Sequence, residues 1–337
     1  MSDQSSQTAQ TICLAILASI ASASALYWLK PVMIPFILSI LLAYLLSPLV
    51  SLLQTRLKLP GGIAIVGSLL VCSLVFYGLI LLIASSISEL SENSSKYQTK
   101  VGQMIDDISQ WLQLRGFDID AQTMKTKLAN MNWGETAGDL ANGLIAFLSN
   151  TFLILIFAIY LLQGQSVDQT DDNASPVRQK IEGRIKRYLT IKIALSAATG
   201  ILTAIILMTL GVDAALLFGI LAFLLNFIPS VGSVIATLLP VPLVLFEPTL
   251  SGTTVLLTIL LPATVHIVIG NVLEPKIMGD SLELHPITIL LSLVFWGMLW
   301  GVPGMLLAVP ISATICVLLD SQSGTKRLAK LMAGQSN

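Results

Sequence analysis

Long apolar runs constrain this chain more than any other feature of its sequence. Those about one membrane span in length lie at residues 11–28, 33–53, 62–84, 143–162, 193–210 and 251–271. A helix needs about 20 apolar residues to cross the hydrocarbon core of a bilayer. Charged residues make up 11% of this chain, against about 25% in soluble domains. The sequence therefore predicts an all-α polytopic membrane protein.

Two further apolar runs, 214–246 and 286–319, are too long for one straight helix and are broken by proline and glycine. The first break reads Ile-Pro-Ser-Val-Gly at 228–232, and the second reads Trp-Gly-Val-Pro-Gly at 300–304. Proline removes a backbone amide. A broken helix in a membrane must be buried in protein or line a water-filled cavity. The two breaks are therefore candidate functional sites.

Two architectures fit these broken runs. Each run is either a kinked spanning helix, which gives eight spans, or a re-entrant hairpin, which gives about six spans plus two hairpins. We expect Asp213 to cap the first run and Pro286 to occupy the first helical position of the second. The hairpin architecture makes 193–246 and 251–319 two units, each a span followed by a hairpin, inserted from opposite sides. Such inverted units with paired broken helices are typical of transporters.

Polar segments separate the apolar runs. Residues 85–140 carry apolar side chains at helical spacing, which favours a helical segment outside the bilayer over a mobile connector. A polar linker at 163–176 leads into a basic amphipathic helix that reaches Lys192. This helix lies either on an anionic membrane surface or packed in the cytosol.

Basic residues set the expected orientation. Lys and Arg cluster after the second span, before the fifth span and at the C-terminus, which predicts that both termini are cytoplasmic. The predicted parts are an N-terminal three-helix membrane region (1–84), an extracytoplasmic helical segment (85–140), a fourth transmembrane helix (141–162), a cytoplasmic linker with the basic helix (163–192), a transport core with broken helices (193–320) and a cytoplasmic tail (321–337).

The residues around both breaks resemble those of the AI-2E transporters, the autoinducer-2 exporter family. The first matching stretch is 226–232, Asn-Phe-Ile-Pro-Ser-Val-Gly. The second is 274–310, which contains Glu-Pro at 274–275, Leu-His-Pro at 284–286, Ala-Val-Pro at 308–310, and Gly279, Gly297, Gly301 and Gly304. The resemblance covers nearly the whole chain, and its specific motifs lie within 211–310.

This resemblance implies a secondary transporter of the bacterial cytoplasmic (inner) membrane that forms a homo-oligomer. Its expected cargo is a small polar solute such as autoinducer-2, which it exports. Other family members are associated with sodium (lithium)/proton antiport, so H+ or Na+ is a second expected cargo. A non-transporting membrane scaffold that recruits partners through 85–140 is a further alternative.

Polar groups inside the spans are the candidate site residues, because ionisable groups there are costly. His266 lies mid-span and is either a hydrogen-bonded packing residue or part of a pathway. Glu274 precedes Pro275, so we expect the helix to end there and to leave Glu274 in a partly buried bend. Burial would raise its proton affinity and let it titrate near neutral pH. Asp280 and Glu283 have the spacing of a helix-capping pair.

At the first break, Asn226 and Ser230 are expected to hydrogen-bond a polar solute or a cation. The hypothesised transport pathway comprises Asn226, Pro229, Ser230, Gly232, His266, Asn271, Glu274, Pro275, Gly279, His285, Pro286, Gly301, Pro303 and Gly304.

The sequence gives little support for catalysis. It has two histidines and no metalloprotease, nucleophile-elbow or phosphate-binding motif. Cys13, Cys72 and Cys316 are dispersed within apolar runs, which predicts free thiols and no metal site. We therefore expect no enzyme activity, no cofactor and no metal. The expected partners are the lipid bilayer and a small solute, and no basic stripe suggests nucleic acid.

Overall fold

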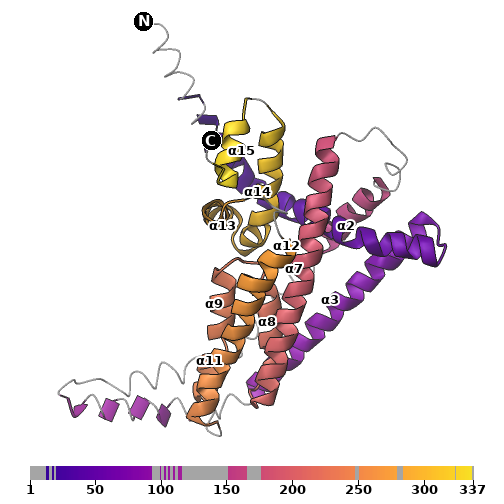
Figure 1. Ribbon diagram of the computed structural model, residues 1–337. Helices are drawn as coiled ribbons and strands as arrows, with labels where there is room; N and C mark the ends of the chain where they lie inside the picture. Colours follow the sequence, from indigo (N-terminus) through magenta and orange to yellow (C-terminus); the bar gives the residue numbers. More distant parts are fainter. Residues whose placement is uncertain are drawn as a thin grey trace, which may run out of the picture. The chain divides into compact units, whose positions relative to one another are not determined.

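The structure, a computed structural model, describes residues 13–92 except 15, 16 and 19, residues 99, 102–103, 105–106, 109–110 and 113–115, and residues 151–164, 176–246, 250–278 and 284–335 except 323. Regular structure in this part of the chain is entirely helical (Figure 1). Most of the predicted segment 85–140, residues 165–175 of the predicted linker, and Gly279, Asp280 and Glu283 lie outside the described residues.

Helices long and apolar enough to cross a membrane confirm the predicted all-α polytopic membrane class. They are Lys30–Arg56, Gly61–Glu89, Ile181–Thr209, Gly252–Met278 and Val302–Ser321. Shorter apolar helices cover Thr151–Gly164, Ala215–Leu225, Val231–Leu245 and Pro286–Trp300.

The chain divides into two compact units. The first unit comprises residues 1–68, 150–188 and 280–337, and the second comprises 69–149 and 189–279. Two helices, α3 (Gly61–Glu92) and α7 (Pro176–Thr209), begin in the first unit and continue into the second.

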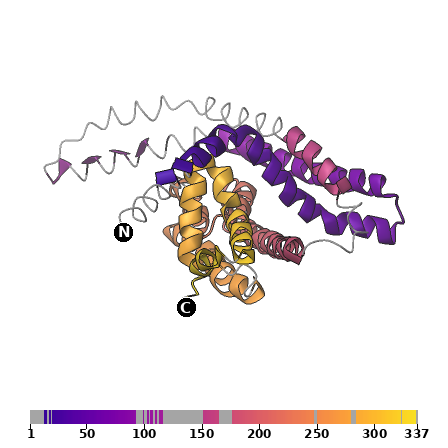
Figure 2. The same cartoon turned by 90° about the horizontal axis from the view of Figure 1, so that it is seen from above.

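The first unit contains α2 (Lys30–Arg56) and the helix Thr151–Gly164, which Figure 2 shows beside α2. The rings of Phe36 and Phe157 meet edge to face at 5.6 Å between these helices. One non-helical residue, Leu29, separates α2 from the helical segment before it. Helix-type hydrogen bonds run on both sides, from Leu29 N to Ala25 O and from Met33 N to Leu29 O, each 2.9 Å. The apolar runs predicted at 11–28 and 33–53 therefore follow each other without a loop.

The second broken run forms a helical hairpin in the first unit, from α13 (Pro286–Trp300) and α14 (Val302–Ser321). Gly301 joins the two helices with φ 67°, a left-handed conformation that glycine adopts without a steric penalty. Gly304 packs so closely that a Cβ there would overlap the carbonyl oxygen of Trp296. The indole Nε1 of Trp300 donates to Leu26 O at 3.0 Å and ties the hairpin to the N-terminal helical segment.

The predicted start of α13 at Pro286 is confirmed. His285 caps this helix, because its Nδ1 accepts a hydrogen bond from Ile287 N at 3.3 Å. The C-terminal helix α15 (Lys326–Ala333) packs on α14, and the backbone N–H of His285 donates to Met332 O at 2.8 Å. His285 therefore has a structural role at the base of the hairpin.

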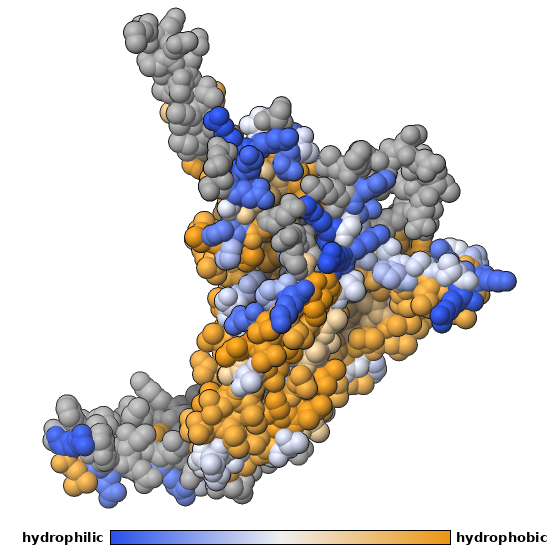
Figure 3. Space-filling view, in the orientation of Figure 1, coloured by the Kyte–Doolittle hydropathy of each residue, from blue (hydrophilic) through white to orange (hydrophobic). Residues whose placement is uncertain are grey.

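In the second unit, four of the helices alternate in direction (Figure 1): α7 from Leu189 onward, α8 (Ala215–Leu225), α9 (Val231–Leu238) and α11 (Gly252–Ile267). The short α10 (Val241–Phe246) links α9 to α11. On the face shown in Figure 3, hydrophobic residues cover α11. Leu256, Leu260 and Ile267 are each at least half exposed, which suits contact with lipid.

The predicted basic helix and the predicted span at 193–210 are parts of a single continuous helix, α7. The intervening sequence, Tyr-Leu-Thr-Ile-Lys at 188–192, contains no proline or glycine to interrupt the backbone hydrogen bonds.

The first broken run is also a hairpin, in which α8 and α9 pack against each other. Gly232 lies so close to the end of α8 that a Cβ would overlap the carbonyl oxygen of Leu225. Each helix is far shorter than the roughly 20 residues that a span needs. Both broken runs are thus helix pairs, and their insertion into the bilayer as re-entrant hairpins stays a prediction.

The expected N-cap of α8 is wrong by one residue. Ala214, not Asp213, precedes the helix, and no side chain caps it. Ala214 adopts φ 54°, in the left-handed region, so the helical turn begins after it.

Small residues bring α7 and α8 together. A Cβ added at Gly200 would lie 2.6 Å from Gly219 O, and one added at Gly219 would lie 2.6 Å from the Cβ of Ala204. Close approach through small residues is how membrane helices maximise van der Waals contact.

Candidate functional site

Within the second unit, α7 carries a line of buried polar side chains along an otherwise apolar stretch. Lys192, Ser196, Thr199 and Thr203 follow one another at three- and four-residue steps, which places them on one face of the helix. Lys192 is 3% exposed and the other three are fully buried. Polar groups in a spanning helix normally face the interior of the helix bundle.

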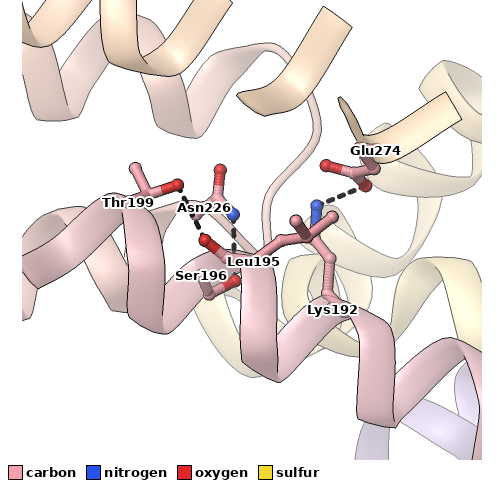
Figure 4. Close-up of polar contacts among 6 residues, drawn as sticks. All are labelled: Lys192, Leu195, Ser196, Thr199, Asn226 and Glu274. Carbon is pink, nitrogen blue, oxygen red and sulfur yellow. Dashed lines mark hydrogen bonds and ion pairs between the residues drawn. The ribbon is translucent and has the colours of Figure 1, made fainter. Parts of the chain in front are cut away.

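An ion pair stands at one end of this line. The Nζ of Lys192 lies 2.6 Å from Oε1 of Glu274 on α12 (Glu274–Met278), as Figure 4 shows. The Glu274 side chain is 19% exposed. A charge removed from water needs an opposite charge or strong hydrogen bonds to be tolerated. The pair therefore links α7 to α12.

The break between α8 and α9 is joined to the same face of α7. Asn226, which ends α8 and is 7% exposed, donates from Nδ2 to Ser196 Oγ at 2.9 Å. One turn further on, Thr199 Oγ1 donates to Leu195 O at 2.9 Å (Figure 4). The first break thus lies one helical turn from the ion pair along α7.

A π-helix, η1 (Val268–Leu273), connects α11 to α12. The expectation that the helix ends at Glu274 is wrong, because Glu274 is helical and the helix continues to Met278. The N–H of Glu274 donates to Ile269 O, five residues back. We attribute the continuation through Pro275 to this wider turn, since a proline in a regular α-helix collides with the carbonyl four residues before it.

The π-helix also sets the direction of Glu274. In a regular α-helix, residues eight apart differ by about 80° around the axis, at about 100° per residue. A π-turn acts as one extra residue, which leaves His266 and Glu274 only about 20° apart. Glu274 therefore lies on the same face as His266 and reaches Lys192.

His266 is 5% exposed, and neither ring nitrogen has a hydrogen-bond partner among the described residues. The same holds, within the described chain, for the buried hydroxyls of Thr203 and Thr258. Leaving a buried polar group unsatisfied costs roughly 1–3 kcal/mol. A native structure with such groups calls for a specific explanation.

The other hypothesised pathway residues fall into two groups. In the second unit, Ser230 is exposed at the turn with φ 60°, Pro229 and Gly232 shape that turn, and Asn271 and Pro275 face outward. In the first unit, His285, Pro286, Gly301, Pro303 and Gly304 form the cap and turn of the other hairpin. Asn226, His266 and Glu274 are thus the predicted residues that lie with the polar face of α7.

Sequence reasoning missed Lys192 as a site residue, together with Ser196, Thr199, Thr203 and Thr258. From the sequence alone, Lys192 was assigned to the basic face of an amphipathic helix. Its spacing of four and seven residues from Ser196 and Thr199 nevertheless places all three side chains on one face of a helix that continues into an apolar run. In the described residues, no group of three or more His, Cys, Asp or Glu side chains is placed to hold a metal ion. The site instead offers hydrogen bonds and one ion pair.

Apolar spans with an ion pair and buried hydrogen-bonding side chains define the class of this protein as a polytopic membrane protein with a polar interior, a feature that marks substrate and ion pathways. The sequence profile of the AI-2E family transporters matches residues 14–323, nearly the whole chain. The chain belongs to this family.

Similar proteins come from several bacteria. The AI-2 transport protein TqsA of Escherichia coli (strain K12) is 30% identical over 317 residues, which cover 90% of this chain and 89% of TqsA. A candidate transport protein of Haemophilus influenzae is 29% identical over 319 residues, 89% of this chain and 90% of that protein. YhhT of Escherichia coli (strain K12), also a candidate transport protein, is 25% identical over 344 residues, 98% of this chain and 96% of that protein.

Proposed function

We propose that this protein exports a small polar solute such as AI-2 across the bacterial cytoplasmic membrane. The observation that carries the proposal is the buried polar face of α7, with its partners Asn226 and Glu274, inside apolar helices. The similarity to TqsA, whose name specifies AI-2 transport, supports the choice of solute.

In this mechanism the second unit supplies the hydrogen bonds that replace water around the solute. Ser196, Thr199 and Thr203 provide hydroxyls at successive turns of α7, and Asn226 provides an amide from the break of the first hairpin. This network holds the helices in one arrangement, and release of the solute would require the network to rearrange. Both termini in the cytoplasm and a homo-oligomeric assembly belong to the proposal.

Flux of AI-2 through purified protein tests this function. The full-length chain is reconstituted into liposomes loaded with AI-2, and release is followed against protein-free liposomes and liposomes holding an unrelated membrane protein. We expect release above both backgrounds that saturates with AI-2 concentration. Release indistinguishable from the backgrounds would count against export of AI-2.

Sodium (lithium)/proton antiport is the second candidate, and the buried Lys192–Glu274 pair favours it. A carboxylate inside a span can exchange a proton for a cation, whereas glutamine cannot. If Glu274 carries the proton, Glu274→Gln should remove Na+-driven proton movement and its pH dependence in pyranine-loaded liposomes. Identical pH profiles for the wild type and the variant would exclude Glu274 as the proton carrier.

A further inference from the structure

We propose that His266 is a solute-binding residue, and that both of its ring nitrogens hydrogen-bond a neutral, hydroxyl-bearing solute held between α7 and α11. This inference rests on the proposed function and deepens it, because it names the residue and the type of bond that hold the solute.

The hydrogen bonding of the buried hydroxyl groups supports a binding site inside the second unit. The buried Thr199 donates to the carbonyl four residues back in its own helix, at 2.9 Å. The hydroxyls of Thr203 and Thr258 are buried but find no partner among the described residues. They lie on the helices α7 and α11 that also carry the polar face and His266. The interior of the unit therefore offers hydrogen bonds that the described chain does not use.

The ion pair fixes which residues of α7 and α11 lie at the same depth. The two helices run in opposite directions (Figure 1), and Lys192 meets Glu274. Thr199 lies seven residues beyond Lys192, about 10 Å along the axis at 1.5 Å per residue. His266 lies eight residues before Glu274, and because the π-turn counts as one extra residue the rise between them is also about 10 Å. His266 and Thr199 are thus close in depth, about one turn beyond Ser196, the partner of Asn226.

Charge favours a neutral solute over an ion at this depth. Lys192 and Glu274 neutralise one another, so their pair supplies no net charge to balance a cation or an anion. Moving an unbalanced ion into an apolar interior is far more costly than moving a hydrogen-bonded neutral group.

The imidazole of His266 determines which hydrogen-bonding groups a neutral solute must carry. A neutral ring presents one N–H donor and one bare nitrogen acceptor. To satisfy both nitrogens, a solute must accept one hydrogen bond and donate another. Hydroxyl groups do both, so a hydroxyl-bearing solute can satisfy the ring.

The two histidines of the chain make a direct test possible. Full-length protein labelled with ¹⁵N at the histidine rings gives signals from His266 and His285, assigned with His285→Asn. His285 is the internal control, because it caps α13 in the first unit. The probes are AI-2 and glycerol, added separately. We expect the His266 ring signals to move with at least one probe and the His285 signals to stay in place.

Every outcome bears on the inference. Unchanged His266 signals with both probes would overturn it, since the ring would then bind water alone. Equal movement of both histidines would also overturn it, because that is a general response of the protein. Failure of the proposed function is separate: movement of His266 with glycerol but no AI-2 flux refutes AI-2 export and keeps the site, whereas AI-2 flux without His266 movement does the reverse.

Variants give a second readout. His266→Leu removes both hydrogen bonds and His266→Gln retains a donor and an acceptor, while Ile267→Leu is a matched control on the exposed side of α11. We expect His266→Leu to weaken solute binding at least about tenfold, with partial recovery in His266→Gln and wild-type binding in Ile267→Leu. Binding is measured from the solute-dependent shift of the melting temperature. Equal binding by all four proteins would contradict the inference.

Discussion

The Lys192–Glu274 pair provides a test of how the second unit is held together. Lys192 is 3% exposed and Glu274 is 19% exposed. Glu274→Gln leaves a buried ammonium without its counter-charge, and breaking a buried pair in this way costs roughly 3–5 kcal/mol. Water at the partly exposed Glu274 position relieves some of this cost, so we expect a loss near the lower end, about 3 kcal/mol.

The two single variants should differ. Lys192→Met leaves Glu274 unpaired, but its 19% exposure gives water access to the carboxylate, so the loss should be smaller than for Glu274→Gln. The double variant Lys192→Met/Glu274→Gln removes both charges and should recover most of the stability, because replacing a buried pair as a whole is often neutral.

Denaturant-induced unfolding in one detergent measures these differences. A double-mutant cycle across the four proteins isolates the coupling between the two side chains. Lys276→Met is the matched control, since Lys276 is exposed on the same helix as Glu274 and should change stability by less than about 0.5 kcal/mol. Additive losses in the double variant, or equal losses in the two single variants, would show that the two side chains do not form a stabilising buried pair.

Three further predictions concern the hairpin turns and the helix contact. Gly232→Ala and Gly304→Ala should each lower thermal stability markedly, because the new Cβ meets backbone carbonyl oxygen, whereas Gly270→Ala has open space and should melt like the wild type. Ser230→Gly should raise stability by about 1 kcal/mol, because Ser230 holds φ 60°, and an unchanged denaturation midpoint would contradict this. Gly200→Leu should separate α7 from α8 and reduce the yield of monodisperse protein in gel filtration.

Among the described residues, the sequence predicts the helices well where an apolar run is long and its ends are marked. Pro286 marks the start of α13, and both broken runs reverse at their proline and glycine clusters. The first residue of a helix was harder to predict where two neighbouring residues could each mark the start. Asp213 is a suitable cap, but the left-handed Ala214 delays the helix.

The site was harder to predict because its contacts join distant parts of the chain. Lys192 and Glu274 are 82 residues apart, and the charge of Lys192 alone fits a surface helix equally well. The π-helix that turns Glu274 toward Lys192 has no distinct composition in Val-Ile-Gly-Asn-Val-Leu. Asn226 was predicted as a site residue because it lies next to the proline and glycine break at 228–232. Its partner Ser196 has no such signal in the neighbouring sequence.

The central claim is that solute crosses through the polar interior of the second unit and not along its lipid-facing surface. The most direct measurement is the initial rate of AI-2 release from liposomes that hold equal amounts of folded wild type, His266→Leu or Ile267→Leu. We expect fast release for the wild type and for Ile267→Leu, and release reduced about tenfold or more for His266→Leu. Equal rates for His266→Leu and the wild type would contradict it.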